Sequence, residues 1–185
     1  MYETVMNELA LSVVRMGYGL RAEEFERVVI EHQRQVLMTA FRLLGRMEDA
    51  QDAAQDVFLR LHRSLGRFDN SREISPWLYR MTVNVCHDLR RKRRVTVGLD
   101  GVEPVAPEFD PLGERKLEER RAAVAEALQS LPEKERAALV LRDIEGLPTT
   151  EVARILGSSE STVRSQISTA RVKISKLLRG RGHVL

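Results

Sequence analysis

The stretch TTEVARILGSSESTVRSQIST, Thr149 to Thr169, has the pattern of two short helices joined by a tight turn. Ala153, Gly157 and Val163 fall at intervals of four and six. They supply a small residue where two helices touch, a glycine in the turn, and a branched apolar residue at the return contact. The stretch therefore predicts a helix-turn-helix.

The second helix of this pair is expected to have one buried and one polar side. Ser159 is a candidate N-cap for it, as Thr149 is for the first helix. Its expected buried residues are Val163, Ile167, Ala170, Ile174 and Leu177. Its outward residues, placed to enter a DNA major groove, are Ser161, Thr162, Arg164, Ser165, Ser168 and Arg171. A helical hairpin used only for packing is the alternative interpretation.

Helical spacing recurs through most of the remaining sequence, and alternating strand patterns with hairpin turns are nearly absent. The fold class is therefore predicted to be all-α. Further helices are expected over about 24–44, ended by Gly45, and over 48–65, 75–94, 114–129, 132–145, 150–156 and 160–178. Residues 95–115, with three Gly, three Pro and an acidic excess, read as a flexible linker.

The chain of 185 residues is long enough to bury a core, and its charge is unevenly distributed. Residues 1–94 carry 16 Lys/Arg against 13 Asp/Glu, residues 95–115 carry one against five, and residues 116–185 carry 13 against nine. Two basic blocks around an acidic one suggest two modules that meet a polyanion. Chance variation of solvated surface is the other interpretation.

The sequence lacks several features that would indicate secretion, membrane insertion or catalysis. Cys86 is the only cysteine, which excludes an intramolecular disulfide, and no apolar run is long enough to span a bilayer. We expect a cytoplasmic protein without membrane insertion, with an N-terminal extension over 1–21. The histidines have no metal-ligand spacing, and no phosphate-binding Gly-rich loop is present. No enzyme activity, cofactor or metal is therefore expected.

The stretch SPWLYRMTVNVCHDLRRKRR, Ser75 to Arg94, predicts a helix that ends in five consecutive cations. Ser and Pro are favourable at its start, and an apolar stripe is expected at Leu78, Met81, Val85 and Leu89. The opposite side carries Arg80, Asn84, His87 and Arg91. A helix dipole accounts for one or two terminal cations, but five in succession repel one another and indicate a phosphate backbone.

Two neighbouring features extend this interpretation. Phe68 and Trp77 offer aromatic faces on which an unpaired base could stack, although aromatics at a helix start are more often core residues. In the preceding helix Asp49, Asp52 and Asp56 form an acidic ridge. Such a ridge is a poor DNA surface and suits either ordinary solvation or docking of a basic protein.

Together these segments resemble the bacterial RNA polymerase sigma factors of the extracytoplasmic-function (ECF) group. DAQDAAQDVFLRLHRSL resembles the polymerase-docking helix of that family, and FDNSREISPWLYRMTVNVCHDLRRKRR resembles its promoter-melting segment. SLPEKERAALVLRDIEGLPTTEVARILGSSESTVRSQISTARVKI resembles its C-terminal DNA-binding region. The resemblance implies sigma region 2 over 22–94, a linker over 95–115 and sigma region 4 over 116–185.

The resemblance also implies partners and site residues. Core RNA polymerase would contact Asp49, Asp52, Gln55, Asp56 and Leu59. The non-template strand of the melted promoter element would contact Phe68, Trp77, Arg80, Asn84, Arg90, Arg91 and Arg93. The C-terminal helix-turn-helix would read a more distant element as duplex DNA, and an anti-sigma protein commonly holds family members inactive. Gln166, Ser168 and Thr169 depart from the basic residues that many relatives have there, which leaves the sequence of that element open.

Two alternatives remain at the level of sequence. One is a free-standing helix-turn-helix regulator, which would bind duplex DNA without polymerase. The other is a helical interaction protein whose basic face meets acidic partners. The first alternative leaves the acidic ridge and the aromatic residues unexplained. The second is excluded if the protein binds single-stranded promoter DNA once core polymerase is added.

Overall fold

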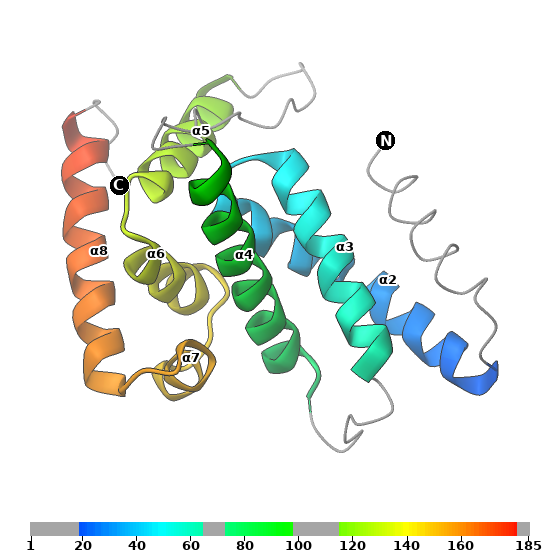
Figure 1. Ribbon diagram of the computed structural model, residues 1–185. Coiled ribbons are helices and arrows are strands. Elements are labelled where there is room, and N and C mark those ends of the chain that lie inside the picture. Colours follow the sequence, from blue (N-terminus) through cyan, green and yellow to red (C-terminus); the bar gives the residue numbers. More distant parts are fainter. Residues whose placement is uncertain (1–18, 65–72, 98–114, 181–185) are drawn as a thin grey trace.

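The computed structural model describes the backbone of residues 19–64, 73–97 and 115–180, and within these ranges every regular element is a helix (Figure 1). The all-α prediction is therefore confirmed. The elements are α2 (Gly19–Leu44), α3 (Met47–Ser64), α4 (Ser75–Val97), α5 (Arg115–Gln129), α6 (Glu133–Leu139), the π-helical turn η2 (Val140–Ile144), α7 (Thr149–Leu156) and α8 (Glu160–Gly180). Most of the expected N-terminal extension and of the expected linker lies outside the described residues, and positions 19–21 of the extension belong to α2.

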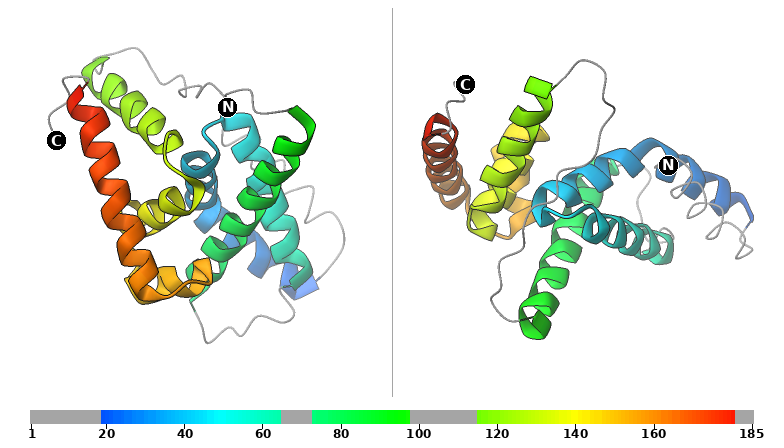
Figure 2. Two further views of the ribbon diagram at one scale, coloured as in Figure 1. Left: turned by 60° about the vertical axis from the view of Figure 1, so that its left-hand side comes forward. Right: turned by 90° about the horizontal axis from the view of Figure 1, so that it is seen from above.

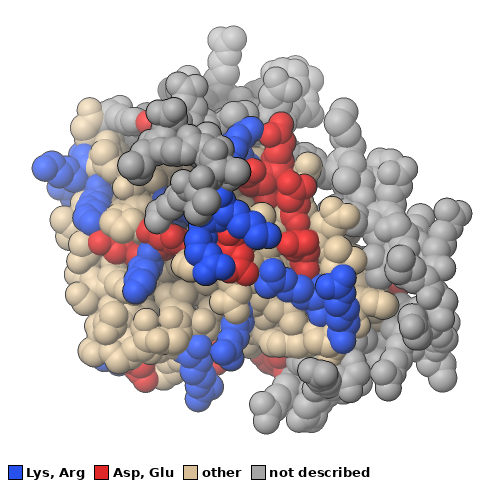
Figure 3. All heavy atoms as spheres, viewed as in Figure 1, with Lys and Arg blue, Asp and Glu red and all other residues tan. Residues whose placement is uncertain are grey.

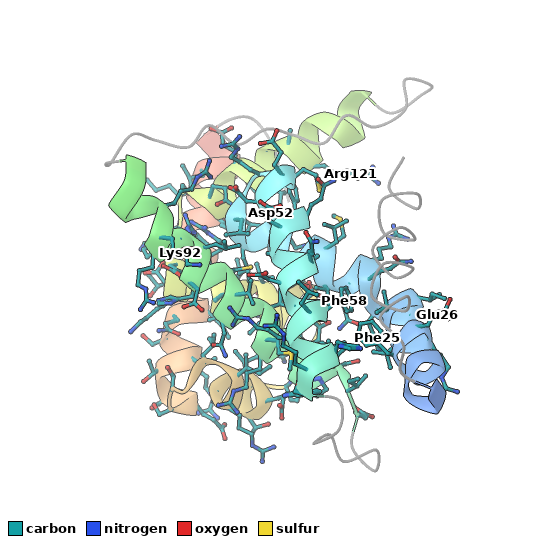
Figure 4. All side chains as sticks on the ribbon, turned by 45° about the vertical axis from the view of Figure 1, so that its right-hand side comes forward. Phe25, Glu26, Asp52, Phe58, Lys92 and Arg121 are labelled. Atoms are coloured by element: carbon teal, nitrogen blue, oxygen red, sulfur yellow. The ribbon has the colours of Figure 1, made fainter. Side chains whose placement is uncertain are left out.

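Helices α2, α3 and α4 form the N-terminal module, which packs around an apolar core. Ala50, Ala53 and Ala54 of α3 are completely buried, and such small side chains let neighbouring helices approach closely. Phe25 of α2 and Phe58 of α3 lie where these two helices meet (Figure 4). The apolar stripe of α3 is buried at Ala50, Ala54, Val57 and Leu61.

The buried side of α4 differs in part from the sequence prediction. Leu78 and Val85 are buried as expected, whereas Met81 and Leu89 are only half-buried. Tyr79, Thr82 and Cys86 complete the buried side, and the Thr82 hydroxyl donates to the Leu78 carbonyl at 2.8 Å. An apolar sequence pattern does not place a threonine in the core. The bond within the helix allows Thr82 to be buried, because its hydroxyl keeps a hydrogen-bond partner. The helix also continues three residues beyond the expected end at position 94.

The C-terminal module comprises α5, α6, η2, α7 and α8, and it contains the expected helix-turn-helix. Gly157 ends α7 in the left-handed conformation, with φ of +59°. Ala153 and Val163 are both buried at the helix contact. The expected cap Thr149 is wrong, because Pro148 holds the cap position and Thr149 is the first helical residue.

Two further predictions for this module need correction. The single helix expected over 132–145 is interrupted, because α6 gives way at Val140 to the π-helical turn. In α8, Leu177 is exposed and Leu178 is buried in its place. The buried set Val163, Ile167 and Ala170 matches the prediction.

The two modules pack directly against each other. Helix α4 lies between α3 on one side and the C-terminal helices on the other, and it contacts α7, while α2 contacts α5 (Figures 1 and 2). Buried residues of both modules belong to one continuous apolar cluster. Sequence analysis predicted the modules but not this contact. No helix in the described ranges combines the length and apolar character needed to cross a membrane.

Candidate nucleic-acid and polymerase interfaces

One side of α4 is polar and open to solvent, as the sequence predicts. Arg80, Asn84, His87 and Arg91 are all exposed. Trp77, at the start of the helix, is half-buried and packs against the apolar core, so its ring is largely a structural group. Phe68 lies outside the described residues. The open side of α4 is therefore a row of three cationic or ionisable groups and one amide.

Some of the arginines at the C-terminal end of α4 have partners within the protein. Arg90 is half-buried, and its Nη1 donates to the Leu43 carbonyl at 3.2 Å, where α2 ends. Arg93 pairs with Asp49 of α3. Arg91 keeps 72% of its side-chain surface exposed, with Asp88 3.8 Å away. Two of the three arginines expected to hold phosphates thus also hold helices together.

The expected docking residues on α3 divide into exposed and partly covered groups. Asp52 and Gln55 are exposed, whereas Asp49, Asp56 and Leu59 are half-buried. Asp52 on α3 and Lys92 on α4 mark the acidic and basic helices in Figure 4. Acidic and basic side chains lie next to each other across the middle of the face in Figure 3.

Ion pairs connect the acidic helix to the basic one. Besides Asp49 with Arg93, Arg60 of α3 lies 3.5 Å from Asp88 of α4. Each pair joins an acid on one helix to an arginine on the other, and the two pairs run in opposite directions. Part of the charge that sequence analysis assigns to partners therefore fixes the packing of α3 on α4.

Helix α8 has a buried apolar side and an exposed polar side near its N-terminus. Ser159 caps the helix as predicted, because its Oγ accepts from the Thr162 amide at 3.1 Å. The exposed side chains are those of Ser161, Thr162, Arg164, Ser165 and Ser168. Arg164 is 65% exposed and reaches back to Glu160 at 2.6 Å. This side has the size and polarity of a helix that enters a major groove.

Farther along α8, the cations pair with acids of the same module. Arg171 donates to both Asp143 oxygens, at 2.8 and 2.6 Å, and this pairing raises the pKa of Arg171. Lys173 donates to both oxygens of Glu135 at 2.8 Å. Arg171 therefore remains exposed, as predicted, but also fastens α8 to the π-helical turn.

Comparison with known proteins decides the family. Residues 28–96 match the model of sigma-70 region 2, and residues 121–174 match that of sigma-70 region 4. The ECF RNA polymerase sigma factor SigM of Mycobacterium tuberculosis is 40% identical over 157 residues, which span 83% of this chain and 76% of that protein. The chain belongs to the ECF sigma factors. These proteins are transcription initiation factors and not enzymes.

Two solved structures resemble this ECF sigma factor over most of its length. CnrH, in complex with the cytosolic domain of CnrY, is 30% identical with a TM-score of 0.63, covering 93% of this chain and 96% of that one. RpoE of Bartonella quintana, in complex with the anti-sigma factor NepR, shares the fold with a TM-score of 0.73 at 23% identity, over 85% and 98% of the chains.

Sequence analysis missed two charged residues that join the modules of this sigma factor. Arg136 is 2% exposed, and its guanidinium donates to four carbonyls. Three of these belong to its own module, Leu128, Gln129 and Leu131, at 2.7 to 2.8 Å. The fourth is Leu43 at the end of α2, at 2.6 Å.

Glu145 is the second missed residue, and it lies at the end of η2. Its carboxylate accepts hydrogen bonds from Thr39, Arg42 and Tyr79 of the N-terminal module. Burial and the nearby Glu145 charge raise the pKa of Tyr79, which therefore remains a neutral hydrogen-bond donor. In sequence Arg136 and Glu145 resemble ordinary surface charges, and only their distant partners reveal their role.

A cavity of about 310 Å³ lies at the junction of the modules. Its lining includes Asn84, His87 and Arg90 of α4, and Glu133, Lys134 and Gln166 of the C-terminal module. The Gln166 Oε1 atom is buried, and none of the residues that the structure describes forms a hydrogen bond with it. Within the described ranges, no three His, Cys, Asp or Glu residues are grouped to hold a metal ion.

Proposed function

We propose that this ECF sigma factor binds core RNA polymerase and brings it to promoters through two separate DNA contacts. The N-terminal module, within the predicted region 22–94, takes up the non-template strand of the melted element. The C-terminal module, within 116–185, reads duplex DNA farther upstream. The observation that carries the proposal is the exposed polar side of α8, from Ser161 to Ser168, opposite a buried apolar side.

The open side of α4 supports the strand-binding role. Arg80, Asn84 and Arg91 are exposed. The two arginines can therefore contact phosphates, and the Asn84 amide can hydrogen-bond the edge of an unpaired base. Arg90 and Arg93 contribute positive potential while they hold α2 and α3. Phe68 and Trp77 remain candidates for stacking on a flipped base. Flipping a base out of the duplex costs a few kcal/mol, which such stacking would partly offset.

The acidic side of α3 supports a contact with a basic surface of the polymerase. Asp52 and Gln55 present their side chains to solvent, with Asp56 and Leu59 half-buried beside them. Complementary charge across such an interface increases the association rate and fixes the orientation of the partners. Asp49 contributes less directly, because Arg93 already neutralises its carboxylate.

Regulation by an anti-sigma protein is the second part of the proposal. The Bartonella quintana RpoE was solved with the anti-sigma factor NepR, and CnrH was solved with the cytosolic domain of CnrY. Both resemble this chain over most of its length, which supports an equivalent partner here. Co-purification with a protein that blocks the assay described next would identify it.

Transcription from genomic DNA fragments by core polymerase tests the proposal. With the sigma factor added, new start sites should appear that core polymerase alone does not use. A free-standing regulator would instead footprint duplex DNA in the absence of polymerase. If the purified chain neither associates with core polymerase nor changes its start sites, the proposed function is wrong.

Base reading by α8 is tested by Arg164→Ala with Arg179→Ala as its control. Both arginines are exposed on the same helix, but Arg179 lies in its last turn. Loss of Arg164 should relax the preference at one base pair of the upstream element by about 1 to 3 kcal/mol. The control should leave the base preference intact. If the two variants had the same base preference, Arg164 would not contact a base.

A further inference from the structure

One carboxylate of the C-terminal module joins two helices of the N-terminal module. Glu145 has a side chain that is 9% exposed. Its Oε1 accepts from Thr39 Oγ1 at 2.9 Å and from Arg42 Nη1 at 2.7 Å, both on α2. Its Oε2 accepts from the Tyr79 hydroxyl at 3.0 Å, on α4. These three donors favour one defined contact between the modules. When the modules separate, the carboxylate loses all three hydrogen bonds, and water or another partner must replace them.

The π-helical turn places Glu145 in this contact. After α6, the wider turn η2 changes the course of the chain, and Glu145 follows it with its amide donating to the Val140 carbonyl at 2.9 Å. Gly146, with φ of +77°, then redirects the chain toward α7. Single π-helical turns are rare and often occur at functional positions. Here the turn directs a carboxylate into the other module.

Two more hydrogen bonds close the contact around the C-terminal end of α2. Gln129 Nε2 donates to the Arg42 carbonyl at 3.0 Å, and Arg136 Nη1 donates to the Leu43 carbonyl at 2.6 Å. The last carbonyls of a helix lack partners within the helix, so they favour donors from outside. Gly45 leaves room for this approach, because a Cβ there would lie 2.6 Å from Gln129 Cδ.

The closed arrangement restricts the strand-binding side of α4. Asn84, His87 and Arg90 line a cavity that residues of α6 and α8 complete. His87 Nε2 lies 4.0 Å from Glu133 Oε1. A DNA strand along this part of α4 would meet Glu133, Lys134 and Ala137 of α6, which line the same cavity. Closure and strand binding therefore compete for the same surface.

We propose that Glu145 is a latch that holds the two modules closed in the free protein, and that it must open before α4 takes up a promoter strand. This inference rests on the strand-binding role of α4 proposed above. The chain between Val97 and Arg115 is long enough to allow separation, since its residues can span about 60 Å at roughly 3.5 Å each. A protein that binds only in its open state has an affinity reduced by the fraction that is open.

The latch is tested first in the free full-length protein. Fluorophores at the exposed positions 31 and 176, introduced as Glu31→Cys and Lys176→Cys, report the separation of the modules. Glu145→Gln should raise the ratio of open to closed molecules at least about tenfold, because the charge-assisted bond from Arg42 is lost. Glu151→Gln is the matched control, since it removes a pair with Arg154 inside α7.

Charge exchange separates the latch from a general loss of stability. Arg42→Glu alone should open the protein through repulsion between two carboxylates. Combining Arg42→Glu with Glu145→Lys should restore the closed separation, with helix content unchanged in all variants. Failure of Glu145→Gln to change the separation, or a double variant as open as Arg42→Glu alone, would overturn the latch.

The functional step is measured as promoter-complex formation with core polymerase at limiting sigma factor. Glu145→Gln should reach half-saturation at a lower concentration than the wild type, by up to the factor measured for opening. An open variant with unchanged half-saturation would overturn the coupling while leaving the proposed function intact. If the wild type formed no promoter complex, the proposed function would fail, and with it the role of the latch in promoter binding.

Discussion

Arg136 illustrates at the scale of one residue why a charged side chain can belong to a core. Its planar guanidinium satisfies four backbone carbonyls at two helix ends, which an apolar side chain would leave without donors. In sequence it stands in the charged run EKER at the start of a helix and indicates a solvated surface. Its partners lie as far as 93 residues away, so no local pattern could identify it.

Asn84 gives the sharpest residue-scale prediction for strand opening. Asn84→Ala removes an exposed amide from α4 and leaves the buried side of the helix unchanged. We expect slower open-complex formation, by the equivalent of about 0.5 to 1.5 kcal/mol for one lost hydrogen bond to a base, with little effect on polymerase binding. Stopped-flow fluorescence of a promoter labelled in the melted region measures the rate.

A pre-opened template provides the control for Asn84. On a promoter with a mismatched bubble, the strands are already separate, so the variant should initiate much closer to the wild-type rate than on duplex DNA. Equal slowing on duplex and bubble templates would assign Asn84 to a later step. Reduced polymerase binding would assign it to docking or to the fold.

Cys86 carries a residue-scale prediction about pH. The side chain is 3% exposed, and burial raises the pKa of its thiol to about 12, against an opposing effect of Arg90. Because the folded pKa is raised, the contribution of the neutral thiol to stability is complete below its ordinary pKa near 9.0 and is lost as pH rises toward 12. Near pH 8 the folded protein should react with a thiol reagent at least about a hundredfold more slowly than the urea-unfolded chain. Comparable rates would contradict the burial.

At the scale of elements, sequence analysis predicted helices well where their ends have a local cause. Gly45 ends α2 with φ of +85°, and Ser159 caps α8. The π-helical turn was not predictable in the same way. Nothing in VLRDI breaks an α-helix, and the turn coincides with tertiary contacts of Asp143 with α8 and of Glu145 with α2 and α4.

The N-cap of α8 gives an element-scale prediction. Ser159→Ala removes the acceptor for the Thr162 amide and should lower the free energy of unfolding by about 0.5 to 2 kcal/mol. Ser168→Ala, at an exposed site farther along α8, is the control and should change it by less than about 0.5 kcal/mol. Urea denaturation followed by circular dichroism measures both. An unchanged free energy of unfolding for Ser159→Ala would show that another group caps α8.

At the scale of the whole molecule, sequence indicated two modules and a linker, but not how the modules lie. Binary patterns report which side of a helix is buried, and they do not state which helix covers it. The sequence therefore predicted two modules without their contact, whereas the structure has one apolar cluster through both modules. Most of the expected site residues that the structure describes are exposed, but six are half-buried: Asp49, Asp56, Leu59, Trp77, Arg90 and Arg93. Some of their charges are paired within the protein.

A shared core predicts cooperative unfolding of the two modules. Trp77, the only tryptophan, reports the N-terminal module by fluorescence, while circular dichroism reports helices of both. In the wild type the two urea transitions should coincide, because unfolding either module exposes the interface of the other. Glu145→Gln should separate them, with distinct midpoints for fluorescence and circular dichroism, whereas Glu151→Gln should leave them coincident. Separate transitions already in the wild type would show that the modules fold independently and that the contact between them adds little stability.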